Sequence, residues 1–209
     1  MRIRIYFAKT EAMRFTGHLD LHKTWERTFR RSGLPLSYSQ GFHPQPRLQL
    51  ACALPLGFTS QAEILDAWLD AELPLEDIRS ALCAAIPPGI RLQRIEIVQQ
   101  PSAALQTQVL SAEYEITLKE DIPDLDDRIA RLLAQQSILR EWRHKPYDLR
   151  PLIEMLETSP ANGADRRILR TRLAAREGAT GRPEELLAAL GIAPDRAKVH
   201  RTGLALRPG

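Results

Sequence analysis

Three side chains able to bind a metal or transfer a proton lie within five residues: His18, Asp20 and His22. His18 and His22 are four positions apart, which on a helix places both imidazoles on one face, as a metal site requires. A third ligand is missing nearby, and His43 is the candidate that the sequence offers. The alternative is that His18 hydrogen-bonds within the loop at a helix start. We therefore expect no metal and no other cofactor.

Two polar stretches flank one predicted helix and could form a site together. Arginine beside a glycine-containing loop offers guanidinium and backbone N–H donors, which suit an anion such as phosphate or carboxylate. We expect the stretches to meet at one end of a sheet and to line one cleft. The alternative is a loop that satisfies its own polar groups, because Ser, Gln and His next to Gly and Pro form turns. The candidates for substrate or anion binding are Arg14, His18, Asp20, Tyr38, Gln40, Gly41, His43 and Arg47.

The intervening helix, predicted at 18–31, has an apolar face formed by Leu21, Trp25 and Phe29. A basic stripe on its other face is either an ordinary solvated surface or a contact for RNA phosphates. Its members are Lys23, Arg27, Arg30 and Arg31. A second cluster, at positions 166, 167, 170 and 172, falls on a predicted strand, where 170 and 172 share a face. Aromatic residues are 6% and no RNA-binding aromatic motif occurs, which argues against base stacking on a sheet.

The elements that must position these residues alternate between strand and helix patterns. Strands are predicted at 2–7, 48–54, 62–70 and 90–98, with helices at 18–31 and from Pro74. After a polar connection at 99–111 the order repeats, with strands at 113–118, 138–144, 166–175 and 198–206 and helices from Pro123 and at 184–190. The stretch 147–153 is predicted as a connection. The sequence therefore predicts an α+β protein of two tandem ferredoxin-like (βαββαβ) units, at 1–98 and 112–209.

Composition limits the class of protein. The chain has 209 residues, 44% of them hydrophobic, which is enough for a core, and no run approaches the roughly 20 apolar residues of a membrane helix. We therefore expect no membrane association. Cys52 and Cys83 are too few for a disulfide framework, so we expect buried, reduced thiols and a cytoplasmic location. The formal net charge is +3, and residues 1–50 hold nine Lys/Arg against three Asp/Glu.

The segments Arg14-Phe-Thr-Gly-His-Leu-Asp20 and Leu34-Pro-Leu-Ser-Tyr-Ser-Gln-Gly-Phe-His-Pro44 resemble those of the bacterial radical-SAM-linked domain family of unknown function. The segments at 53–57, 148–153, 181–183 and 201–202 also match its pattern, so the resemblance covers nearly the whole chain. His22 departs from the apolar residue usual in the first motif. The resemblance implies a radical SAM protein with a cobalamin-binding-type domain as partner, fused or encoded nearby, and the family is often encoded near a ribonuclease of the E/G type. The chain lacks the CxxxCxxC motif of a radical enzyme, so it resembles only the linked partner.

Two main functions follow as hypotheses. The first is a non-catalytic partner of a radical SAM protein that binds or presents a substrate, with RNA or a ribosome-related protein as candidates. The second is an RNA-binding protein or metal-independent endoribonuclease of tandem ferredoxin-like architecture, which would use His18 or His43 as general base. A metal-dependent small-molecule enzyme is a third alternative. No motif fixes a base, an acid and a charge-stabilising group in one place, so we expect binding without independent catalysis.

Overall fold

The first strand, β1 (Arg2–Lys9), follows the alternation expected from the sequence, with Ile3, Ile5 and Phe7 fully buried. The structure is a computed structural model that describes residues 1–99, 101–142, 144–160 and 167–207. The chain is divided into two compact units. Unit 1 comprises Met1–Gln108 together with the C-terminal end of the chain from Arg207, and unit 2 comprises Val109–Leu206.

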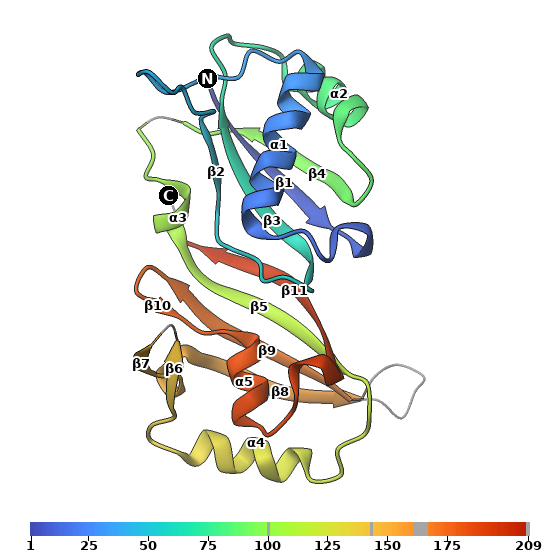
Figure 1. Cartoon of the computed structure of the whole chain (residues 1–209), viewed down its shortest axis with the longest axis vertical. Helices are drawn as coiled ribbons and strands as arrows, with labels where there is room; N and C mark the ends of the chain where they lie inside the picture. Colours follow the sequence, from blue (N-terminus) through green and yellow to red (C-terminus); the bar gives the residue numbers. More distant parts are fainter. Residues whose placement is uncertain (100, 143, 161–166, 208–209) are drawn as a thin grey trace. The chain divides into compact units, whose positions relative to one another are not determined.

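Unit 1 contains a four-stranded antiparallel sheet, and along the chain α1 connects its first strand to its second and α2 connects its third to its fourth (Figure 1). Its remaining elements are η1 (Glu11–Met13), α1 (His18–Ser32), β2 (Leu48–Leu50), β3 (Thr59–Trp68), α2 (Leu75–Ala85), β4 (Ile90–Ile97) and α3 (Leu105–Gln108). Strand β1 pairs with β3 on one side and β4 on the other, and β2 pairs with β3. The order β4-β1-β3-β2 is that of a ferredoxin-like βαββαβ fold, as predicted.

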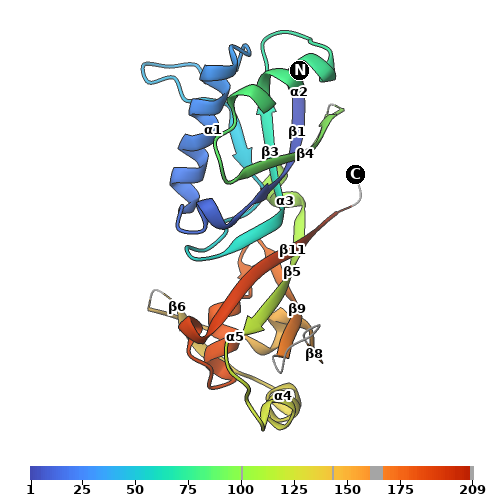
Figure 2. The same cartoon turned by 90° about the vertical axis from the view of Figure 1, so that its right-hand side faces the viewer.

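The core of unit 1 lies between the sheet and its two long helices, which lie on one side of the sheet (Figure 2). Trp25 of α1 has no solvent exposure and meets Phe7 of β1 edge to face, with ring centroids 4.9 Å apart. Ile78 and Leu82 of α2 join the same cluster. The apolar face predicted for the 18–31 helix is therefore its buried face.

The opposite face of β1 carries a buried ion-pair cluster instead of a solvated surface. Asp66 of β3 has no solvent exposure and accepts hydrogen bonds from Arg2 Nε at 3.0 Å and Arg4 Nε at 2.8 Å. Arg2 also donates to the carbonyl oxygens of Ser102 and Ala103, at 3.1 and 2.9 Å. The cluster thus joins β1, β3 and the segment after β4, and the hydrogen bond to Asp66 raises the pKa of Arg4.

Unit 2 repeats the same strand order. Its elements are β5 (Val109–Leu118), α4 (Leu125–Ala134), β6 (Leu139–Trp142), β7 (Lys145–Asp148), η2 (Arg150–Leu152), β8 (Ile153–Pro160), β9 (Arg167–Arg176), β10 (Ala179–Thr180), α5 (Pro183–Ala189), η3 (Pro194–Arg196) and β11 (Ala197–Leu206). Antiparallel pairing gives the order β11-β5-β9-β8, and the short strand β10 pairs antiparallel with the end of β9. Ala112, Tyr114, Ile116 and Leu118 of β5 are buried at alternate positions.

Two expectations about unit 2 are corrected. The stretch 138–144 is not the second strand of the core sheet, because β6 and β7 form a separate two-stranded hairpin. The second strand is β8, which begins within the stretch predicted as a connection. The connection expected at 99–111 contains α3 and the first residues of β5. Position 166, predicted to start a strand, lies outside the described residues.

Two further observations concern the composition argument. Cys83 is exposed because it lies beside Leu82, one position away from the buried stripe of α2, so the expectation of a buried thiol is wrong there. Cys52 is half-buried. Across the described ranges, no helix has both the length and the apolar character needed to cross a membrane.

The Asp66 cluster generates a stability prediction. Replacing Asp66 with Asn keeps the side chain's shape but leaves two buried guanidinium groups without a counter-charge. We expect D66N to lower the free energy of unfolding of unit 1 by about 3–5 kcal/mol, as for other broken buried pairs. Urea denaturation measures this. The control is E113Q, which breaks the exposed Glu113–Arg172 pair and should cost less than about 1 kcal/mol. Equal costs in the two variants would contradict the structural role of the cluster.

Candidate nucleic-acid interface

Helix α1 presents the predicted basic stripe to solvent. It begins after Gly17, which is extended, and ends at Gly33, whose φ of 70° is the left-handed conformation that glycine adopts without strain. Burial of Leu21, Trp25 and Phe29 fixes which side of the helix faces the sheet. The remaining side therefore faces water along the length of the helix.

Three of the four basic side chains are available for a ligand. Lys23, Arg27 and Arg30 are exposed and make no hydrogen bond or ion pair with any residue that the structure describes. Arg31 differs, because its Nη2 donates to the carbonyl oxygen of Ala85 at the end of α2, at 2.6 Å. Arg31 therefore also links the two helices. Asp20 and Glu26 lie on the same helix and offset part of its positive charge.

The second polar stretch forms an exposed loop, residues 38–47, between α1 and β2. The backbone N–H of Ser39 donates to the carbonyl of Gln45 at 2.8 Å, and the N–H of Gln45 donates to Ser39 Oγ at 2.9 Å. Phe42 is fully exposed between these contacts, and Tyr38 is 45% exposed. Gln40, Gly41 and His43 are exposed as well, and Arg47 lies 5.0 Å from the ring centroid of Trp68.

The first polar stretch has a different neighbour from the one predicted. Arg14 Nε donates to the carbonyl of Gly57 at 2.7 Å, and the N–H of Gly57 donates back to the carbonyl of Arg14 at 3.0 Å. Lys9, which is fully buried, donates to the carbonyl oxygens of Arg14 and Phe58. The stretch 14–20 therefore lies against the turn that precedes β3. His18 is half-buried, and Asp20 is exposed.

The expected shared cleft of 14–20 and 38–47 is wrong. Gly57, the partner of Arg14, precedes β3, whereas Ser37 and Arg47 hydrogen-bond to the backbone of Trp68 at the end of β3. A ten-residue strand separates these points by about 30 Å. The stretches precede and follow α1, so they lie at its opposite ends (Figure 1). Because α1 crosses the sheet between them, residues 14–20 and 38–47 cannot lie at the same end of the sheet.

The same geometry removes the metal site considered from the sequence. His43 belongs to the far loop and cannot complete a set with His18 and His22. His22 Nε2 is hydrogen-bonded to the carbonyl oxygen of Leu48 at 3.4 Å, which links α1 to β2. Among the described residues there is no group of three or more His, Cys, Asp or Glu side chains placed to hold an ion.

The arginines on the sheet of unit 2 are paired with carboxylates. Arg170 Nε lies 3.1 Å from Glu115 Oε1, and Arg172 Nη2 lies 2.5 Å from Glu113 Oε1. Arg167 points to the other face, where it pairs with Asp126 of α4. The second basic cluster is therefore largely neutralised by its own neighbours, and position 166 lies outside the described part of the chain.

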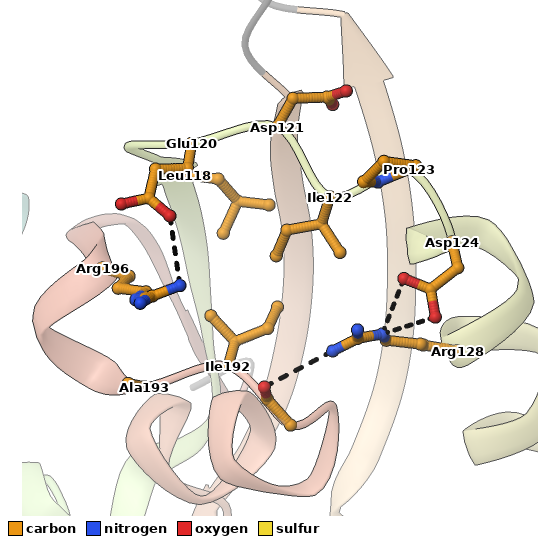
Figure 3. A pocket seen from close by; sticks show the side chains of 11 residues that line it. Leu118, Glu120, Asp121, Ile122, Pro123, Asp124, Arg128, Ile192, Ala193 and Arg196 are labelled. Carbon is orange, nitrogen blue, oxygen red and sulfur yellow. Dashed lines mark hydrogen bonds and ion pairs between the residues drawn. The ribbon is translucent and has the colours of Figure 1, made fainter.

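A pocket of about 370 Å³ lies where the β5–α4 connection meets the α5–β11 connection (Figure 3). Its two arginines are already engaged. Arg128 contacts both oxygens of Asp124 at 3.0 Å and donates to the carbonyl of Leu190 at 3.1 Å, and Arg196 pairs with Glu120 at 3.1 Å. Arg128 thereby satisfies a carbonyl at the end of α5, which is a structural role. This pocket offers no uncommitted cation from the described residues to an anionic ligand.

A second hollow, which the sequence did not predict, lies beside the β6–β7 hairpin. It has a volume of about 480 Å³, and its walls include Trp142, Tyr147 and Arg182. The guanidinium of Arg182 lies 4.1 Å from the ring centroid of Trp142. Trp142 and Arg182 are forty positions apart, so no local pattern could join them. The one sequence signal near this hollow is the strand predicted at 138–144, which the strand pattern assigns to the core sheet and not to a hairpin.

Comparison with protein families gives a match over most of the chain. The model of the family described as "Uncharacterized protein conserved in bacteria (DUF2344)" matches residues 2–183, so the chain belongs to this family. No curated protein matches the chain.

Among solved structures, the chain is similar to one chain of the "Crystal Structure of a Cbf5-Nop10-Gar1 Complex". The TM-score is 0.50 and the sequence identity is 12%, and the match covers 97% of this chain and 48% of that one. The chain thus spans about half the length of the chain that it matches. At this identity the similarity concerns the fold alone and is compatible with the α+β architecture.

Loop 38–47 generates a prediction about what Phe42 is for. Its ring is fully exposed, so F42S should change the free energy of unfolding by less than about 0.5 kcal/mol. The matched comparison is F29A, which empties a fully buried site in α1 and should cost about 3–5 kcal/mol. Urea denaturation of both variants measures the difference. A cost above about 1 kcal/mol for F42S would show that the ring serves the fold and would remove it from the candidate interface.

Proposed function

We propose that this member of the DUF2344 family is a non-catalytic RNA-binding protein that contacts single-stranded RNA through α1 and loop 38–47. The observation that carries the proposal is the state of the cations on α1. Lys23, Arg27 and Arg30 are exposed and uncommitted within the described residues, whereas Arg2 and Arg4 in unit 1 and Arg170 and Arg172 in unit 2 are paired with carboxylates. Uncommitted cations along one helix face suit a row of phosphates.

Loop 38–47 supports a preference for single strands. It follows α1 directly and begins at the same end of unit 1 as Arg30 (Figure 1). Phe42 and Tyr38 present exposed rings, on which unpaired bases can stack at roughly 1–3 kcal/mol per base. Duplex RNA hides its bases from such rings. Phosphate contacts along α1 with stacking at its end therefore favour an unpaired strand.

The arrangement argues against RNA cleavage by the histidines considered from the sequence. His18 is the first residue of α1 and His43 lies in the loop after it, about 20 Å away along a 15-residue helix. A general base and a general acid must both reach one phosphodiester through hydrogen bonds. These two histidines cannot do so together. We therefore propose binding or presentation of RNA without independent catalysis.

The motif resemblance to radical-SAM-linked proteins adds a partner to the proposal. The motif stretches 14–20 and 53–57 meet through the Arg14–Gly57 hydrogen bonds. They expose three apolar side chains, Phe15 at 75%, Leu19 at 74% and Leu56 at 62%. Exposed apolar groups that gather on one surface mark protein contacts. We propose that a radical SAM protein docks on this end of unit 1 and receives RNA bound at α1.

The RNA proposal is tested with a triple variant, K23A/R27A/R30A. We expect its affinity for a labelled single-stranded RNA to fall at least tenfold, because three phosphate contacts are lost. The slope of log K against log salt should become less steep by about 2, at roughly 0.7 per contact on a single strand. Fluorescence anisotropy at several salt concentrations, with a chelator present, measures both quantities.

The matched control for this experiment is R91A/R131A/K198A, which removes three exposed cations elsewhere. It should bind RNA nearly as well as the unmodified protein. Equal loss in the two triple variants would show that only net charge matters, which contradicts a specific role for α1. If the unmodified protein cleaves RNA in the presence of the chelator and H18A does not, the ribonuclease hypothesis would replace the proposal.

The partner proposal is tested separately with F15D/L19D, which places charge in the exposed apolar surface. We expect this variant to fold and bind RNA normally, because both side chains already face water. It should lose co-purification with a radical SAM protein co-expressed from the same organism. The control is L139D, which places a carboxylate at a leucine that is 79% exposed in unit 2. Retained co-purification of F15D/L19D would contradict docking at this surface.

A further inference from the structure

The hollow beside the β6–β7 hairpin, here called the hairpin pocket, combines an aromatic face with two cations. Trp142 and Lys145 are directly opposite in the hairpin, so both project from the same point of the ladder. Arg182, just before α5, stacks on the indole at 4.1 Å. Trp142 remains 41% exposed, so part of its surface is open to a ligand. The volume of about 480 Å³ is within the range of small-molecule sites.

The floor of the hairpin pocket adds polar groups that could read a ligand. The hydroxyl oxygen of Tyr147 is buried and lies beside the guanidinium of Arg182, which interacts with it without the geometry of a full hydrogen bond. Burial and the nearby Glu185 raise the pKa of Tyr147, against the opposing effect of Arg182, so the hydroxyl stays protonated and can donate. Thr180 Oγ1 donates to the carbonyl of Arg176 at 3.2 Å and keeps its lone pairs for a donor on the ligand.

The rest of the surroundings holds the hairpin pocket in shape. Asp148 accepts hydrogen bonds from the N–H groups of Ile138 and Arg150 at 2.7 and 2.9 Å, which lowers its pKa and fixes the base of the hairpin. Arg140 pairs with Glu185 of α5 at 2.7 Å and ties the hairpin to that helix. The lining of the hairpin pocket holds two cations, Lys145 and Arg182, against one carboxylate, Asp148, which gives it a net positive character. Arg182 can donate to the Tyr147 oxygen, and the hydroxyl hydrogen is then available to an acceptor on a ligand.

We propose that the hairpin pocket binds one nucleotide, with its base against Trp142 and its phosphate between Lys145 and Arg182. A planar base gains from stacking on an indole, and a phosphate matches the guanidinium fork and the ammonium point charge. The hydroxyl groups of Tyr147 and Thr180 lie in the walls, where they can hydrogen-bond to the base edge or the ribose. The nucleotide is either free or one residue of an RNA strand. This inference does not rest on the α1 interface, which belongs to unit 1.

The first experiment titrates the full chain with AMP, GMP, CMP and UMP, and with a single-stranded RNA pentamer, by isothermal titration calorimetry. Binding of a mononucleotide but not the pentamer supports a free nucleotide as ligand. Tighter binding of the pentamer than of any mononucleotide by K23A/R27A/R30A, which lacks the α1 cations, supports a nucleotide within a strand. Absence of binding by all five probes at millimolar concentration overturns the proposal. The K23A/R27A/R30A variant should keep its mononucleotide affinity, so failure of this proposal and failure of the α1 proposal are distinguishable.

Variants then assign the binding to the hairpin pocket. W142L removes the aromatic face but keeps apolar bulk, and R182A removes one cation. We expect each to weaken mononucleotide binding at least tenfold, and Y147F to weaken it less. The matched control is W68L in unit 1, where Trp68 likewise stacks with Arg2 and Arg47, at 4.8 and 5.0 Å. W68L should leave binding unchanged. Unchanged binding in W142L, or equal losses in W142L and W68L, would overturn the assignment.

Discussion

The buried carboxylate of Asp66 joins two strands of the sheet of unit 1 by charge. It has no solvent exposure and receives both Arg2 and Arg4, so β1 and β3 are joined by charge as well as by their backbone ladder. A register slip of one residue would turn these charges toward the apolar core. Arg2 extends the cluster to Ser102 and Ala103, which holds the segment after β4 over this face of the sheet. This face is therefore covered at Arg2 and Arg4, whereas Arg94 of β4 remains exposed on it and Glu96 is half-buried.

The same pairing rule separates structural arginines from those available for recognition. In unit 2, Arg170 and Arg172 of β9 pair with Glu115 and Glu113 of β5. The positive and negative charges on this face of the sheet therefore offset each other. Arg128 is committed to Asp124 and to the end of α5. By contrast, the side chains of Lys23, Arg27 and Arg30 on α1 have no hydrogen bond or ion pair with any residue that the structure describes. A count of arginines could not have made this distinction, because it depends on which carboxylate lies across a strand or one helical turn away.

The sequence predicted the repeated strand–helix order because proline and glycine mark the helix ends and because Leu21, Trp25 and Phe29 fall on one helical face. It failed where periodicity is ambiguous. The stretch 138–144 carries strand-like residues but forms half of a hairpin, and β8 was missed because its segment lacks a clear alternation. The shared cleft failed for a geometric reason, since a helix that crosses a sheet holds the two segments at its ends apart. The hairpin pocket depends on Trp142 and Arg182, which only the tertiary fold brings together.

Both units place exposed aromatic residues at the same point of the βαββαβ order, between the first helix and the second strand. In unit 1 this connection is loop 38–47 with Tyr38 and Phe42, and in unit 2 it is the β6–β7 hairpin with Trp142. The sheet needs only a short connection there, and lengthening a surface loop costs little, because the closure entropy grows with the logarithm of its length. In unit 1, one face of the sheet carries the Asp66 ion-pair cluster, and in unit 2, one face of the sheet carries the Glu113–Arg172 and Glu115–Arg170 pairs. The surfaces proposed for recognition are therefore loop 38–47, the β6–β7 hairpin and α1. Each proposed site thus includes the connection between the first helix and the second strand of its unit.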